Sequence, residues 1–174
     1  ILVLRKQATV IGVFGSNTAG GDPLLDIASA PGENSLMRFL TSGSERLRID
    51  KVGNVGIGVV PVTSWDTFTA LQIQGSSLSG LGENNTVLGS NVYHNSNAFK
   101  YIGTGAATLY QQRLGEHKWF GAASGTAGNT ASVTQHMVID SSGNVGIGTT
   151  NPLTLLHIAA TGAPDIRIQD LDGT

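Results

Sequence analysis

A short phrase that occurs twice constrains the fold of this chain more than any other feature. Residues 47–58 read LRIDKVGNVGIG, and residues 137–148 read MVIDSSGNVGIG. Both copies share the motif I-D-x-x-G-N-V-G-I-G, and a proline follows each of them, at Pro61 and Pro152. Repetition of a fixed pattern predicts a modular and elongated architecture, because each repeat forms one supersecondary unit that packs on its neighbours.

The local chemistry of the phrase predicts a β-hairpin. Apolar and charged residues alternate along residues 46–50, which is the period of a strand with one apolar and one charged face. The segment Asp50–Gly53 suits a type I turn followed by a left-handed glycine, since aspartate accepts backbone N–H groups and glycine adopts positive φ without steric cost. We therefore predict a hairpin with a glycine bulge there and at Asp140–Gly143.

The strand after each turn alternates a branched residue with glycine. Glycine along one whole face weakens a strand unless something packs closely against it. Two explanations stay open at this stage: tight bends in the chain, or the close approach of another backbone, for example that of a second copy.

Around the phrase lies a longer period. The pieces Leu25–Ile27, Leu71–Ile73 and Leu156–Ile158 share the pattern L-x-I, and each lies downstream of a proline. The chain is therefore predicted to consist of an N-terminal segment (1–24), a short β unit (25–61), a long β unit with an inserted meander (71–152) and the start of a third unit (156–174). Because Ile1 stands where an initiator methionine would be and the third unit stops at Thr174, we expect a piece of a longer protein.

The composition favours an all-β fold and excludes several classes of function. Charged residues make up 13% of the chain, against about 25% in typical domains, and glycine accounts for 24 of 174 residues. A net charge of −2 without a basic cluster argues against nucleic-acid binding. No apolar run approaches the roughly 18 residues of a membrane span, so no membrane insertion is expected.

The long unit contains most of the aromatic residues. Six of the ten lie between residues 93 and 120. Turn signals at intervals of about ten residues predict an antiparallel meander, with strands at 86–94, 99–102, 107–113, 116–122 and 132–139. The aromatic residues either fill a small β core or contact a glycan, since an aromatic ring stacks on a sugar while its polar group bonds to it. The candidates for glycan contact are Tyr93, Tyr101, Tyr110 and Trp119.

The repeat resembles those of tailed-bacteriophage tail fibres. The likeness rests on L-R-I-D-x-x-G-N-V-G-I-G followed by a short link, a proline and L-x-I, and also on residues 99–105, 111–112, 117–119 and 124–129. It covers residues 36–174, and before them residues 25–27. The resemblance implies an elongated homotrimer whose strands are wound or stacked about one axis, located in the virion tail and exposed outside the host cell. It also implies a role in host attachment, with other virion tail proteins and a host surface glycan or receptor as partners.

A trimer axis would give the glycines of the phrase a physical reason. The branched residues Val55, Ile57, Val145 and Ile147 could form the buried seam between chains. Alternatively, the glycines could face the axis, and the sequence leaves both arrangements open.

No catalytic, cofactor or metal site is predicted. Glycoside hydrolysis needs two carboxyl groups at a set spacing, whereas the acidic residues are scattered, and Asp50 and Asp140 are explained as turn residues. The histidines lack the paired spacing of metal ligands; they are His94, His117, His136 and His157. We therefore expect a non-enzymatic structural segment. The alternatives are a trimeric bacterial surface adhesin stalk, although no coiled-coil heptads are visible, and a segment of a polysaccharide-depolymerising tailspike.

Overall fold

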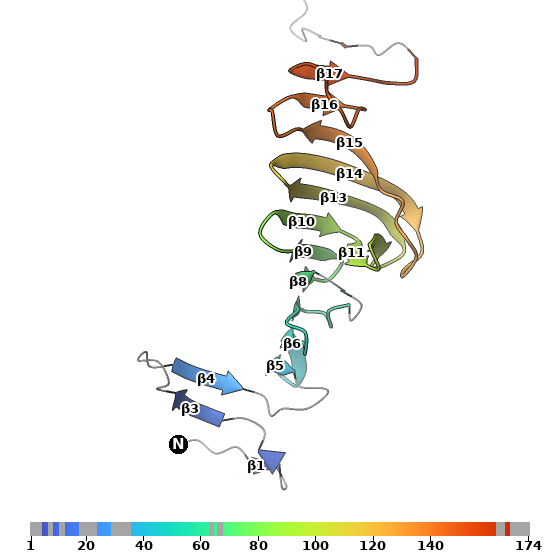
Figure 1. Cartoon of the computed structure of the whole chain (residues 1–174). Coiled ribbons are helices and arrows are strands. Elements are labelled where there is room, and N and C mark those ends of the chain that lie inside the picture. Colours follow the sequence, from blue (N-terminus) through green and yellow to red (C-terminus); the bar gives the residue numbers. More distant parts are fainter. Residues whose placement is uncertain are drawn as a thin grey trace, which may run out of the picture. The chain divides into compact units, whose positions relative to one another are not determined.

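The chain is all-β. The computed structural model describes the backbone of residues 5–6, 9–10, 13–17, 24–28, 36–62, 65, 68–162 and 166–167, with side chains from residue 36 onward. Within these ranges it forms seventeen strands and no helix, and most of the strands belong to a large, mostly antiparallel sheet (Figure 1). The described residues accordingly contain no helix with the length and apolarity needed to cross a bilayer.

The chain divides into two compact units, residues 1–63 with 69–74 and residues 64–68 with 75–174. In the first unit, β1 (Arg5–Lys6) pairs with β2 (Thr9–Val10), and β3 (Val13–Asn17) pairs with β4 (Leu24–Ala28). The strands that follow are β5 (Met37–Thr41), β6 (Ser44–Ile49), β7 (Val55–Ile57) and β8 (Thr69–Ile73). They lie side by side in that order, antiparallel except for the parallel pair β7–β8.

The second unit contains seven strands of the large sheet and a separate hairpin. Its sheet strands are β9 (Ser76–Gly80), β10 (Asn85–Ser90), β13 (Gly105–Arg113), β14 (Glu116–Gly125), β15 (Thr134–Ile139), β16 (Val145–Ile147) and β17 (Leu156–Ile158), in this spatial order. The hairpin consists of β11 (Val92–Asn95) and β12 (Ala98–Tyr101). Of the predicted third unit, residues 163–165 and 168–174 lie outside the described part of the chain.

The repeated phrase forms the predicted hairpin in both places. The N–H of Gly53 donates to the carbonyl of Asp50 at 3.1 Å, and that of Gly143 donates to the carbonyl of Asp140 at 3.0 Å. Both glycines have positive φ, +91° and +86°. Local turn chemistry therefore fixes this hairpin, which joins β6 to β7 in one unit and β15 to β16 in the other.

The link after each hairpin leads to a parallel strand. In β7 and β8, Val55 is opposite Leu71, and in β16 and β17, Val145 is opposite Leu156. A parallel pair needs a crossover connection, and here the proline-bearing link provides it. Each L-x-I strand, which the sequence places at the opening of the next unit, thus pairs with the V-G-I strand of the phrase before it.

The crossover explains the glycine at the centre of each V-G-I strand. A Cβ on Gly56 would lie 2.3 Å from the carbonyl oxygen of Val59 and 2.6 Å from Cδ of Pro61. A Cβ on Gly146 would lie 2.8 Å from the carbonyl oxygen of Thr149. In the structure, the close approach expected at these glycines is made by the chain's own link.

The inserted segment departs from the predicted simple meander. The strand predicted at residues 86–94 is broken at Asn91, which adopts a left-handed φ of +58°. Its side chain accepts a hydrogen bond from the Gly103 N–H at 2.6 Å and donates to the Ala106 carbonyl at 3.1 Å. The chain therefore leaves the sheet for the β11–β12 hairpin, and β10 pairs directly with β13.

The fit of the link over Gly56 predicts a clear effect of Gly56→Ala. A methyl group there would meet the backbone of Val59, which cannot rotate away as a flexible side chain can. We expect a loss of about 1–3 kcal/mol in the free energy of unfolding, measured by chemical denaturation at a fixed protein concentration. Gly75→Ala is the matched control because its Cβ would meet nothing within 4 Å, and it should change stability by less than about 0.5 kcal/mol. Equal effects of the two variants would contradict this account.

Candidate assembly surface

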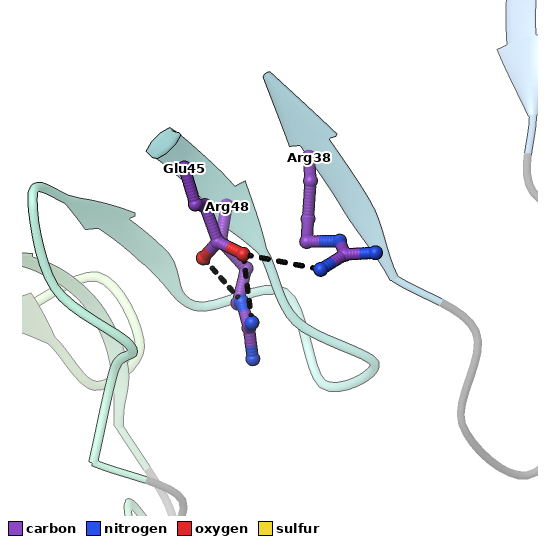
Figure 2. A network of polar contacts seen from close by, with 3 residues as sticks. All are labelled: Arg38, Glu45 and Arg48. Carbon is purple, nitrogen blue, oxygen red and sulfur yellow. Dashed lines mark hydrogen bonds and ion pairs between the residues drawn. The ribbon is translucent and has the colours of Figure 1, made fainter. Parts of the chain in front are cut away.

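The sheet of the first unit has one polar and one apolar face, as the alternation in the sequence predicts. On the polar face, Nε and Nη2 of Arg48 donate to the carboxylate oxygens of Glu45 at 2.7 and 2.8 Å, and Nη1 of Arg38 lies 3.6 Å from Oε2 of Glu45 (Figure 2). The hydrogen bond from Arg48 is the main cause that lowers the pKa of Glu45. The charged groups of this cluster are therefore paired within their own face.

The crossover link closes the polar face further along the sheet. Arg48, Gly56 and Gln72 are in register across β6, β7 and β8, so they share this face. The buried side chain of Gln72 accepts a hydrogen bond from the Val62 N–H at 2.9 Å and donates to the Gln74 carbonyl at 2.8 Å. Burial of this amide is tolerated because both its oxygen and its nitrogen have partners.

The opposite face of the first unit is apolar and open. Cross-strand register aligns two rows of side chains on it: Met37, Ile49, Val55 and Leu71, and beside them Phe39, Leu47, Ile57 and Ile73. Phe39, Ile57 and Ile73 remain 51%, 40% and 48% exposed. Complete burial of a side chain of this size typically contributes about 1.5–3 kcal/mol, and in the chain by itself these side chains stay largely in water.

The second unit has the same arrangement over more strands. Cross-strand register brings one large side chain from each of the seven strands into a line, which we call the apolar row: Leu78, Leu88, Tyr110, Trp119, Met137, Ile147 and Ile158. Leu78, Leu88 and Ile147 are 47%, 56% and 42% exposed. We call the face that carries this row the open face.

The other face of this sheet is covered by the β11–β12 hairpin and contains the core. Val92 of the hairpin packs over Gly89, where a Cβ would lie 2.5 Å from its Cγ2 atom, and its carbonyl accepts a hydrogen bond from Ser77 at 2.9 Å. Val87, Leu109 and Val138 point to this side and are buried. In the second unit, the chain itself therefore covers one face of the sheet, and the other face stays exposed.

The four aromatic residues proposed for glycan contact are divided between the two faces. Tyr93 and Tyr101 are 7% and 5% exposed. The Tyr101 hydroxyl donates to the Ala123 carbonyl at 2.6 Å, and the Tyr93 ring packs on Trp65. Tyr110 and Trp119 belong to the open face, with ring centroids 5.1 Å apart. The structure thus brings together two of the four residues and places the other two in the core.

His117 joins the aromatic pair on the open face. Its Nδ1 is in hydrogen-bond contact with the Tyr110 hydroxyl, which also accepts a bond from Gln112 Nε2 at 3.2 Å. Sequence reasoning considered this histidine as a metal ligand and missed its place beside Tyr110. The sequence signal was the two-residue turn Leu114–Gly115. A hairpin closed by this turn places Gln112 opposite His117.

The acidic residues of the two turns are used structurally. Oδ1 of Asp140 accepts hydrogen bonds from the N–H groups of Ser142 and Asn144 at 2.8 and 2.9 Å, and Oδ2 accepts one from Asn144 Nδ2 at 3.2 Å. Asp50 accepts the corresponding bonds from Val52 and Asn54. Within the described ranges, no three histidine, aspartate or glutamate side chains gather in a way that could hold a metal ion.

Comparison with known proteins gives no family. No protein-family model matches the chain, and a search of curated proteins likewise finds no match.

The hydrogen bonds to Asp140 predict a stability that depends on pH. The backbone N–H of Asn144 is the main cause that lowers the pKa of this carboxyl. A lowered pKa in the folded state means that the stabilisation is complete above the ordinary aspartate pKa of about 4 and is lost as the pH falls through the lowered value. Asp140→Asn should therefore lower Tm near neutral pH, and the difference from wild type should shrink in acid.

The measurement is thermal unfolding of both proteins between about pH 7 and pH 2 at one protein concentration. Ser141→Ala, at an exposed position of the same turn, serves as the control and should show the same small Tm difference throughout. A difference between wild type and Asp140→Asn that stays constant into acid would show that the carboxylate charge contributes nothing.

Proposed function

We propose that the chain is a non-enzymatic structural segment of a homotrimeric tail fibre of a tailed bacteriophage. In this proposal it is exposed on the virion outside the host cell and takes part in host attachment. The observation that carries the proposal is the module built by the repeated phrase, in which hairpin, link and parallel strand close one face of the sheet and leave an apolar face open. The resemblance of the repeat to tail fibres supplies the kind of assembly.

The open faces favour assembly with further copies over an isolated monomer. Monomeric soluble proteins rarely expose extended apolar patches, and such patches commonly mark interaction sites. Here one large side chain from each strand is aligned by register in both units, and each of these side chains is exposed or half-buried. A regular surface that repeats with the module is better suited to contact with identical copies than to one irregular ligand, since oligomers of identical chains repeat their contacts by symmetry.

The use of the acidic side chains supports a role without catalysis. Asp50 and Asp140 accept hydrogen bonds from their own turns, and Glu45 binds Arg48. Glu116 lies 2.6 Å from Lys118 Nζ. Each of these carboxylates already has a structural partner, which leaves it poorly suited to the acid–base pair that glycoside hydrolysis needs.

The oligomeric state tests the proposal directly. Light scattering coupled to size exclusion should give a mass three times that of the 18.0 kDa chain, because the apolar faces are buried between copies. Sedimentation velocity should show a frictional ratio well above that of a compact particle of equal mass. A folded monomer at every concentration would refute the proposal.

The two alternative classes are distinguished by location and activity. Antibodies raised against the chain should label the tails of virions by immunogold microscopy, whereas labelling confined to bacterial surfaces would favour an adhesin stalk. Release of oligosaccharides from host envelope glycans by the purified protein would favour a depolymerising tailspike.

A further inference from the structure

We infer that the open face of the second unit, centred on the apolar row, is the surface through which copies of this chain pack on one another. The inference rests on the proposed function, which requires contacts between identical chains but does not say which face makes them. The sequence left two arrangements open, with either the branched residues or the glycines toward the axis. The structure favours the branched residues, because the glycine side is already occupied by the link.

Two rows of side chains flank the apolar row on the open face. On one side they are small: Ser76, Ser90, Thr108, Gly121 and Thr134. On the other side they are Gly80, Thr86, Gln112, His117, Ile139, Val145 and Leu156. None of the residues in these three rows is aspartate, glutamate, lysine or arginine.

The lack of formal charge in these rows makes the open face compatible with itself. Identical chains around a symmetry axis bring identical groups close together, and like charges held face to face would oppose assembly. Lys118, by contrast, is in register with Gln111 and Val138 and therefore lies on the covered face, where it pairs with Glu116. The charges of these strands are thus kept off the surface that a second copy would meet.

The shape of the open face also suits another copy of the same sheet. Across β9, β10 and β13, the flanking residues Ser76, Ser90 and Thr108 are small, which leaves room beside the apolar row for side chains from a neighbour. At Gly121 the ring of His136 fills this space, since a Cβ there would lie 2.7 Å from its Nε2 atom. Sheets that pack face to face lie about 10 Å apart and interdigitate their side chains. The covered face offers no such contact because the β11–β12 hairpin already packs on it.

This assignment gives Tyr110 and Trp119 a role other than glycan contact. They occupy adjacent strands at the centre of the apolar row, with their rings 5.1 Å apart. Tyrosine and tryptophan are enriched at the buried centres of protein interfaces. In the assembled protein these two side chains anchor one chain to the next.

Single-cysteine variants test which face lies between chains. The chain contains no cysteine, so each variant reports one position. Leu88→Cys and Ile147→Cys place a thiol in the apolar row. Ala127→Cys places one at an exposed position in the loop that is hydrogen-bonded to β12 on the covered side. The purified oligomer is treated with a mild oxidant or with a short bis-maleimide and analysed on denaturing gels, and thiol accessibility is checked with a chromogenic disulfide reagent.

We expect Leu88→Cys and Ile147→Cys to give a species of twice the chain mass and Ala127→Cys to remain a single chain. Cross-linking of Ala127→Cys without the other two, or equal cross-linking of all three, in a protein that is still trimeric would overturn the inference and leave the proposed function standing. A protein that is monomeric before treatment would overturn both.

A charge substitution gives an independent measurement. Leu88→Lys brings like charges together if the open face lies between chains, and it should raise the dissociation constant of the oligomer by about tenfold or more. Ala127→Lys is the control and should leave it unchanged. Circular dichroism establishes that both variants retain β structure. Unchanged assembly of a folded Leu88→Lys protein would contradict the inference.

Discussion

The contact between the crossover link and the central glycine of each V-G-I strand determines the rest of the architecture. At Gly56 and at Gly146, backbone or side-chain atoms of the link lie where a Cβ would be. The link can therefore lie flat on the sheet and bring the L-x-I strand back parallel to the V-G-I strand. Because the link occupies one face, the apolar side chains of the same strands have to project from the other. At these strands, the division into a closed and an open face follows from this steric requirement, and over β9 and β10 the β11–β12 hairpin closes the same face.

The chemistry of the two faces follows the same division. On the closed face of the first unit, Glu45 binds Arg48, and Gln72 bonds the link through its oxygen and Gln74 through its nitrogen. The three rows on the open face of the second unit carry no formal charge, so their side chains need only removal from water. Burial of such side chains against any complementary apolar surface is favourable. An identical chain would offer a surface with the same spacing of side chains. The covered face is thus completed within one chain, whereas in the proposed assembly the open face is covered by other copies.

The parts of the fold that depend on neighbouring residues could be predicted from the sequence. The hairpins at Asp50 and Asp140 are fixed by an aspartate that binds nearby N–H groups and by a glycine with positive φ, and both are found as expected. The break at Asn91 was missed because asparagine tolerates a left-handed conformation without requiring it. The apolar row was missed because it depends on the register between β10 and β13, which the excursion at Asn91 separates, and on the bulge in the pairing of β14 with β15. The same missed break hid the placement of Tyr93 and Tyr101, which belong to the β11–β12 hairpin and not to the sheet.

The segment that leaves the sheet at Asn91 is a place where the length of this chain can change. Because β10 and β13 pair with each other directly, residues 91–104 are spliced into a strand connection without altering the register on either side. The entropic cost of closing a connection grows slowly with its length. Segments of different length and composition can therefore replace one another at this point as long as they cover Val87 and Leu109. The sheet thus tolerates different segments on its covered face, while in the proposed assembly the opposite side of the same strands is constrained by its contact with other copies.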